Sequence, residues 1–220
     1  MSAPIDPTEV LTLLSQERMS WYKKDLNSWR LLSDADALRR YEDQAALQAK
    51  TWVFIGGVEV ILRNALHHAL TDHYGAWHDE DSPFVRVLAA LDAKRLREAR
   101  RTCEADRTRR SRTSGNAAIE PGHVVAALTF GFWRKLLSRS YDRTLWVPTL
   151  HNAFLPGTAR RRVYDAADRL NIQRNRIAHH ERIANPHQIK QAGQNLAGAI
   201  HPQAELWVST LWSEIQIARP

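Results

Sequence analysis

The sequence predicts an all-α protein, and three observations carry that prediction. Apolar residues recur at spacings of three and four along most of the chain, which is the period of an amphipathic helix. No run combines period-two alternation with the Asn-Gly or Asp-Gly turn of a β-hairpin. No low-complexity linker divides the 220 residues. We therefore expect one all-α domain over residues 1–220.

The first helices are predicted from their start signals. A helix is expected over residues 7–23, because a proline stands at its first position and a threonine and a glutamate follow. Ser33 or Asp34 can cap a second helix, which leads into a long apolar segment over residues 47–74. A glycine follows that segment where a helix is expected to stop.

The middle of the chain is predicted to be a loop and two helices. Residues 76–83 are polar and favour a loop, whereas residues 84–112 resume helical spacing and become strongly basic. Ser114-Gly115-Asn116 ends this helix. Pro121-Gly122 then introduces a buried helix over residues 123–139.

The C-terminal part is predicted to hold two further helices. Residues 143–155 form a short helical or irregular connector before a Pro-Gly turn. A helix is expected over residues 160–183, ended by Asn185-Pro186. A last helix over residues 187–217 is expected to break at Pro202.

Composition limits the kinds of partner that this chain can have. The net charge of +7 and the isoelectric point near 9.9 favour a polyanion, either nucleic acid or an acidic membrane surface. Many soluble bacterial proteins are basic without such a partner. The single cysteine, Cys103, suits a reducing cytoplasm, and the first residues do not form a signal peptide. Glycines and a glutamate interrupt the longest apolar run, near residues 52–62, so we expect no membrane span.

The segment 174–181, Arg-Asn-Arg-Ile-Ala-His-His-Glu, carries the groups needed to cleave RNA without a metal. Histidine transfers protons near neutral pH, and arginine neutralises charge that grows on a phosphate. On a helix, Asn175 and His179 share a face, and so do Arg176 and His180. Arg174 lies about 140° from His179 around the axis, so one helix alone makes a loose site. Two copies packed antiparallel, or one such helix against a similar one, could bring two arginines and two histidines onto one phosphate. A solvated helix end is the alternative interpretation of the two histidines.

A second segment repeats this pattern at nearly the same spacing. Arg63-Asn64 is followed by His67 and His68, and Glu59 stands four residues before Arg63. One interpretation is an ion pair between Glu59 and Arg63 that fixes helix packing. The other is a supplementary RNA-binding surface made by Arg63, Asn64 and His68.

The basic run over residues 94–112 has the charge for phosphate contacts, although a solvated helix face is the alternative. The arginines expected to bind RNA are Arg97, Arg100, Arg101, Arg109 and Arg110, together with Arg176 of the first motif. His67, His68, His73 and His78 lack the cysteine or carboxylate pattern of a zinc site, so no metal and no cofactor are expected.

Four segments, taken in order, resemble the Abi-like (abortive infection) family of HEPN-domain proteins. Residues 41–50 match it weakly. The other three are Glu59-Val-Ile-Leu-Arg-Asn with Tyr74-Gly75 and Trp77, Leu128-Thr-Phe-Gly-Phe-Trp133 with Leu136-Leu137, and Arg174-Asn-x-x-Ala-His-His180. The basic stretch 91–116 departs from the pattern and is interpreted as a possible insertion.

The resemblance implies a HEPN-type helical bundle with additional helices, and a homodimer in which the two motifs face each other. It implies metal-independent RNA cleavage in a bacterial phage-defence or toxin system, with an antitoxin or an activator as a candidate partner. Arg174 and His179 would be catalytic, Asn175 would orient them, and His180 would stand beside them. The alternative is a non-catalytic HEPN module that binds RNA or regulates, or that only assembles with a partner.

Overall fold

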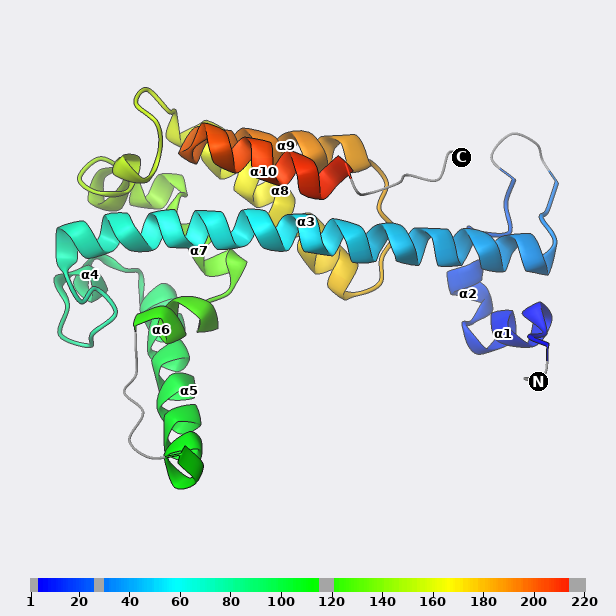
Figure 1. The fold of residues 1–220 in the computed structure, drawn as a ribbon, viewed down its shortest axis with the longest axis horizontal. Helices are drawn as coiled ribbons and strands as arrows, with labels where there is room; N and C mark the ends of the chain where they lie inside the picture. The colour runs from blue at the N-terminus through cyan, green and yellow to red at the C-terminus, as the bar shows by residue number, and fades with distance from the viewer. Residues whose placement is uncertain (1–3, 26–29, 115–120, 214–220) are drawn as a thin grey trace.

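The prediction of an all-α fold is confirmed. The computed structural model describes residues 4–25, 30–114 and 121–213, without the side chains of residues 109–114. Across these residues the elements are α-helices and three short 3-10 or π turns, and the β structure is an isolated bridge between Lys24 and Leu31. One long helix, α3, runs across the molecule, and helices from both ends of the chain pack against it (Figure 1).

Helix α3 (Asp34–Tyr74) is 41 residues long, and its two ends are the predicted ones. The Ser33 hydroxyl accepts a hydrogen bond from the Asp36 amide at 3.1 Å, which caps the first turn. Gly75 has φ of 63°, a left-handed conformation that suits glycine and stops the helix. One face of the helix is buried between residues 54 and 70. Its buried apolar side chains there include Phe54, Ile55, Val58, Leu62, Leu66 and Leu70.

The apolar run was expected to be interrupted and too short to span a membrane, and this expectation about its length was wrong. The two glycines do not interrupt α3, and a window of it with mean hydropathy 1.3 is long and apolar enough to cross a bilayer. About one third of this window is buried inside the protein. A single such helix is weak support for a membrane span, because a core helix passes the same test.

The N-terminal prediction of one helix was wrong: the segment forms α1 (Pro7–Leu13) and α2 (Gln16–Met19). Ser15 breaks it with φ of 72°, and its hydroxyl then accepts a hydrogen bond from the Arg18 amide to start the second helix. The two short helices pack on the start of α3 and form a separate apolar cluster with Leu11, Met19, Tyr22 and Ala37 at its centre.

Two further predicted helices are also divided. The basic segment forms α4 (Pro83–Val87) and α5 (Ala90–Ser114), because Leu88 adopts an extended conformation. The buried segment forms α6 (Pro121–Ala127) and α7 (Phe130–Leu136), divided where Thr129 is extended. Helices α5 and α6 lie side by side, and α5 projects away from α3 (Figure 1).

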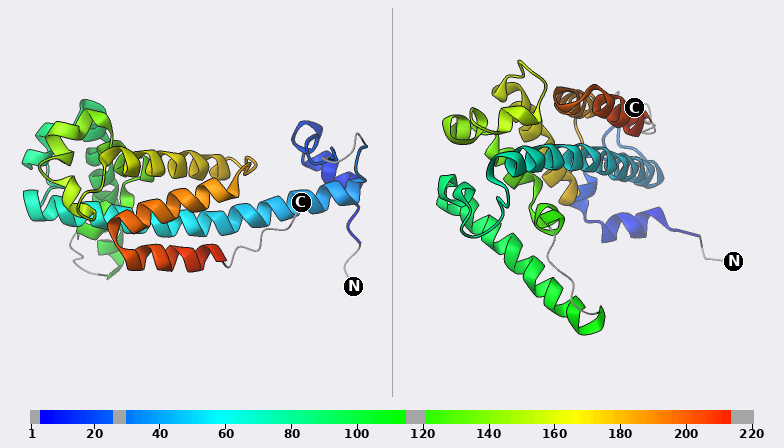
Figure 2. Two further views of the ribbon diagram at one scale, coloured as in Figure 1. Left: turned by 90° about the horizontal axis from the view of Figure 1, so that it is seen from above. Right: turned by 60° about the vertical axis from the view of Figure 1, so that its left-hand side comes forward.

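The last three helices are α8 (Arg160–Ala178), α9 (Pro186–Ile200) and α10 (Pro202–Ser213). The connector before them forms the predicted short turns, and the predicted break at Pro202 is confirmed. Helix α8 ends five residues earlier than predicted, so both histidines of the motif lie beyond its last residue. Figure 2 shows α8, α9 and α10 running beside α3, where they bury the main apolar core.

Close packing of α9 on α3 depends on a glycine. A Cβ atom at Gly193 would lie 2.3 Å from Cζ of the fully buried Phe54, whereas a Cβ at Gly56 would meet no atom within 4 Å. Distances below about 3 Å force neighbouring atoms to move, and a tightly packed aromatic ring has little room to do so.

We expect Gly193→Ala to lower the free energy of unfolding by about 1–3 kcal/mol, because the added methyl group overpacks the core. Gly56→Ala is the matched control, and it should raise that free energy by about 0.5–1 kcal/mol, since alanine favours the helix and meets nothing. Urea unfolding followed by circular dichroism measures both. A stabilising Gly193→Ala would show that the α3–α9 contact can relax.

Candidate functional site

The two motif histidines form the cap at the C-terminal end of α8. The Glu181 amide donates to the Arg176 carbonyl at 2.8 Å, and the His180 amide donates to the Ile177 carbonyl at 2.9 Å. These two bonds define a Schellman motif, whose left-handed position is usually glycine or asparagine. Here that position is His180, with φ of 55°. A histidine therefore occupies a backbone conformation that disfavours most side chains.

Three side chains hold this cap in place. Arg176 Nε lies 3.0 Å from Glu181 Oε2, so an ion pair joins the two residues that an apolar contact often joins in this motif. Gln48 of α3, which is buried, donates through Nε2 to the Glu181 carbonyl at 2.7 Å. Arg18 of α2 donates through Nη1 to the His180 carbonyl at 3.3 Å. The loop after α8 is thus tied to both α3 and α2.

A cavity of about 350 Å³, which we call the histidine pocket, lies between this cap and α2. Both imidazoles are exposed there, beside two arginines that the sequence pattern did not single out, Arg18 and Arg182. The other lining residues are Glu17, Trp21, Tyr22 and Glu181. In Figure 1 the end of α8 emerges below α3 on the side where α2 lies. Two imidazoles and two guanidiniums suit a phosphate ligand.

Trp21, in the turn that follows α2, contacts Arg182 of the histidine pocket. The guanidinium carbon of Arg182 lies 3.8 Å from the centre of the Trp21 ring, and that of Arg40 lies 5.2 Å from it. Such cation–π contacts restrict where the guanidinium can point. Burial, and then the neighbouring Tyr41, raise the pKa of Tyr22.

Arg174 and Asn175 line a different cavity of about 310 Å³, which we call the arginine pocket. Three guanidiniums meet there, from Arg95 of α5, Arg134 of α7 and Arg174 of α8. The remaining lining residues are Thr129, Phe130, Gly131, Asn171 and Asn175. The guanidinium carbon of Arg174 lies 5.0 Å from the centre of the Trp52 ring on α3. The pocket is again suited to an anion.

Glu59 of α3 stands close to this pocket and is half-buried. Burial raises the pKa of Glu59, while the charges of Arg174 and then Arg63, and the Phe130 backbone amide, counteract the effect. The interpretation of Glu59 as a partner of Arg63 is therefore incomplete, because Arg174 of the motif acts on the same carboxyl. Sequence spacing within α3 could not have revealed that contact.

The His179 amide donates to the Asn175 carbonyl at 3.1 Å, so the two residues lie one helical turn apart. They line different pockets: His179 caps α8 and lines the histidine pocket, whereas Asn175 lines the arginine pocket. Arg176 and His180 are separated in the same way, since Arg176 turns to Glu181. One chain thus brings Arg174 together with Asn175, and His179 together with His180, but it does not bring the two pairs into one pocket.

In the second motif segment, which runs from Arg63 to His68, one residue contributes to packing. His67 Nδ1 accepts a hydrogen bond from Trp77 Nε1 at 2.9 Å, and burial, followed by the charges of His68 and His78, lowers the pKa of His67. Asn64 and His68 are exposed on α3, and Arg63 is half-buried with an Nε atom that has no hydrogen-bond partner. These three residues, which were expected to bind RNA, line neither pocket.

The basic helix α5 reaches the arginine pocket through Arg95 rather than through the arginines expected from its sequence. Arg97 and Arg101 are exposed, and Arg100 is half-buried, 4.0 Å from Glu104. The side chains of Arg109 and Arg110 lie outside the described residues. Arg95 and Arg134 each lie in a segment that the sequence pattern singled out, but nothing in the spacing showed that they face Arg174.

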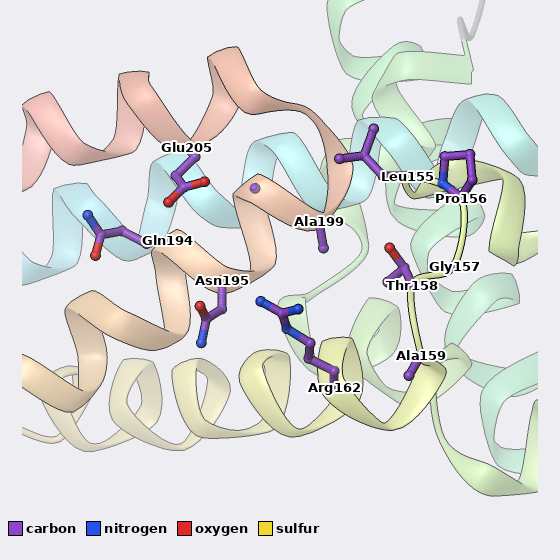
Figure 3. A pocket seen from close by; sticks show the side chains of 11 residues that line it. Leu155, Pro156, Gly157, Thr158, Ala159, Arg162, Gln194, Asn195, Ala199 and Glu205 are labelled. Carbon is purple, nitrogen blue, oxygen red and sulfur yellow. The ribbon is translucent and has the colours of Figure 1, made fainter.

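A further cavity lies away from both pockets. A polar cavity of about 400 Å³ lies among α8, α9 and α10, with Arg162 of α8 and Asn195 of α9 facing it (Figure 3). In the part of the chain that the structure describes, no three His, Cys, Asp or Glu side chains gather as metal ligands would. The two cation-rich pockets at the end of α8 therefore form the candidate site.

Comparison with protein-family models, curated proteins and solved structures found no match to this chain. The likeness of its four segments to the Abi-like HEPN family therefore stays a resemblance. The two pockets themselves are the first basis for inferring a function.

The cap offers a variant that removes one imidazole without harming the fold. We expect His180→Gly to raise the free energy of unfolding by about 1 kcal/mol, because glycine adopts the left-handed conformation without the cost that a Cβ atom brings. Thermal or urea unfolding measures the change. His187→Gly, inside the first turn of α9, is the control and should destabilise the protein by a similar amount. A destabilised His180→Gly variant would mean that the imidazole itself holds the loop.

The stability of Glu59→Gln relative to the native protein should depend on pH. The folded-state pKa of Glu59 is raised, so its favourable contribution is complete below the unfolded pKa of about 4.3 and is lost as the pH rises through the folded value. We therefore expect Glu59→Gln to gain stability relative to the native protein between pH 4 and pH 7. Urea unfolding at both pH values tests this, and an unchanged difference would contradict it.

Proposed function

We propose that this protein is a metal-independent endoribonuclease that cleaves RNA by attack of a ribose 2′-hydroxyl. One observation supports the proposal most: two exposed imidazoles share the histidine pocket with two guanidiniums, and a second pocket with three guanidiniums lies at the same end of α8. Imidazoles supply the proton transfers that the reaction needs, and guanidiniums neutralise the phosphate.

The proposed reaction begins when one imidazole takes the proton from a ribose 2′-hydroxyl. The 2′ oxygen then bonds to the adjacent phosphorus, and the bond from phosphorus to the 5′ oxygen of the next nucleotide breaks. A protonated imidazole gives its proton to that leaving oxygen. The products are a 2′,3′-cyclic phosphate and a 5′-hydroxyl, so neither an oxidant nor a water molecule is consumed.

Two cations, Arg18 and Arg182, line the same pocket as the histidines within one chain. We propose that they neutralise the phosphate that is cleaved. Arg174 would act on that phosphate only from a second copy of the chain, since Arg174 and His179 of one copy line different pockets. The proposal therefore includes a homodimer in which the ends of two α8 helices face each other.

The resemblance to Abi-like HEPN proteins supports the same proposal. It would place the protein in the cytoplasm of a bacterium, in a phage-defence or toxin system with an antitoxin or an activator. The HEPN-type bundle is likewise proposed from the resemblance, beyond the all-α class that the structure shows.

A second candidate function is a non-catalytic RNA-binding or regulatory module. The observation that favours it is the separation of Arg174 from His179 within one chain. If no second copy completes the site, both pockets still hold cations that bind phosphates without cleaving between them.

The purified protein, incubated with total RNA in excess EDTA, is expected to produce fragments with 2′,3′-cyclic phosphate and 5′-hydroxyl ends. His179→Ala should reduce the cleavage rate about 100-fold or more, because it removes a group that transfers a proton in the transition state. End mapping by ligation and sequencing measures both results. DNA of matched sequence should stay intact, since it lacks the attacking hydroxyl.

Two variants serve as matched controls for this assay. His187→Ala removes an exposed histidine of α9, and Arg161→Ala removes an exposed arginine that pairs with Asp165 on α8. Both should cleave at the native rate. Cleavage of DNA would contradict the mechanism, and RNA binding without cleavage would favour the second candidate function.

Mixing inactive variants separates a site within one chain from a site across two chains. If Arg174 of one copy acts with His179 of the other, Arg174→Ala mixed with His179→Ala should recover about a quarter of the native activity, because half of the dimers are mixed and each has one intact site. No recovery would assign the cation role to Arg18 and Arg182 of the same chain.

A further inference from the structure

The arginine pocket is assembled from helices that are far apart in the sequence. Arg95, Arg134 and Arg174 come from α5, α7 and α8, and they line one cavity of about 310 Å³. Like charges repel, so three guanidiniums around one space are costly unless an anion or nearby carboxylates offset them. The positions of those carboxylates decide which explanation fits.

The carboxylates hold two of the arginines from outside the pocket. Arg134 Nη1 lies 2.6 Å from Asp168 Oδ1, and it also donates to the Tyr164 hydroxyl at 3.1 Å. Arg95 Nη1 lies 3.1 Å from Oδ1 of Asp92, which is buried. Neither aspartate is among the described residues that line the pocket, and neither is Glu59, whose carboxyl interacts with Arg174. The acids therefore fix the arginines without filling the space between them.

The Asp92 carboxylate is itself fixed. It accepts a hydrogen bond from the Tyr141 hydroxyl at 2.7 Å, and burial together with this bond raises the pKa of Tyr141 to about 12. The same hydroxyl accepts a hydrogen bond from the Ala89 amide at 2.9 Å. Arg95 is thus anchored through Asp92 to a buried network, which lowers the entropy cost of binding a ligand.

Donor groups in the pocket remain available to a ligand. A guanidinium carries five N–H donors, and the bonds to Asp92, Asp168 and Tyr164 use only some of them. Arg134 Nε is buried and has no hydrogen-bond partner. The other polar side chains lining the space are Thr129, Asn171 and Asn175, which carry no charge. A phosphate accepts from arginine forks and amides at once.

We propose that the arginine pocket binds a backbone phosphate of RNA next to the one cleaved at the histidine pocket. Arg95 and Arg134 are positioning residues in this proposal, which rests on the proposed function and names where its substrate is held. His179 stands five positions after Arg174, and five positions correspond to about 7.5 Å along a helix axis. A single strand can therefore contact both pockets.

The test uses short single-stranded RNA whose 2′-hydroxyls are methylated, so that it can bind but cannot be cleaved. Asn171→Asp places a carboxylate among the three guanidiniums and leaves their partners Asp92 and Asp168 in the chain. We expect it to weaken binding by about tenfold or more in fluorescence anisotropy. Asn195→Asp on α9 is the matched control, with the same charge change in the cavity of Figure 3, and should bind as the native protein does.

Arg95→Gln and Arg134→Gln give an independent measurement. Each should lower the salt dependence of binding, reducing the slope of log affinity against log salt by about 0.7 for each phosphate that the variant no longer neutralises. Thermal unfolding of each variant checks that the fold persists. Unchanged affinity in Asn171→Asp, with unchanged slopes in the arginine variants, would overturn the proposal.

Two further measurements separate this proposal from a site for a free anion and from the proposed nuclease activity. Titration of inorganic phosphate, followed by tryptophan fluorescence, tests a free anion as the ligand, and phosphate binding lost in Asn171→Asp while RNA binding persists would overturn the RNA assignment. Cleavage of unmodified RNA in EDTA is measured separately. Loss of methylated RNA binding in Asn171→Asp without native cleavage would keep the phosphate pocket and reject the nuclease.

Discussion

The continuous length of α3 is the constraint on which the rest of the structure depends. Forty-one helical residues extend about 60 Å, and the two apolar clusters pack on different parts of this one rod. The main cluster takes the buried face from Phe54 onward, and the N-terminal cluster takes the start at Ala37. Because both clusters share a rigid helix, the N-terminal helices stand at a defined place relative to α8.

That arrangement explains how a helix end becomes a pocket. Gln48 lies on α3 between the two clusters, and it bonds the carbonyl of Glu181 directly after the histidines. Arg18 reaches the same loop from α2, 162 residues away in sequence. The N-terminal helices thus close one side of the space in front of His179 and His180. Without them, the two imidazoles would stand on an open helix end, which was the alternative interpretation of the motif.

The sequence predicted the positions of the helices better than it predicted which residues come together in the folded chain. Capping chemistry at Ser33 and Gly75, and the prolines at 121 and 202, are local signals that lie within a few residues of the boundaries they set. The breaks at Ser15, Leu88 and Thr129 fall on residues that are neither glycine nor proline, so the strongest local stop signals are missing there. The early end of α8 was missed for a related reason, because the left-handed residue there is a histidine.

The same distinction separates the parts of the candidate site that were found from those that were missed. One short motif contains Arg174, Asn175, His179 and His180, and a short motif can be recognised in the sequence. Arg18, Arg95 and Arg134 reach the site from three other helices, so only the packed chain identifies them.

The identity of residue 180 links the geometry to function most directly. A glycine there would complete the Schellman motif at lower conformational cost, and the ion pair between Arg176 and Glu181 would hold the turn unchanged. The chain instead keeps an exposed imidazole in a left-handed conformation, beside a second imidazole and two guanidiniums. Backbone strain of this kind persists where the side chain does something that the cap does not need. Packing gives no reason for a histidine at this position, whereas the proposed proton transfer at a phosphate would give one.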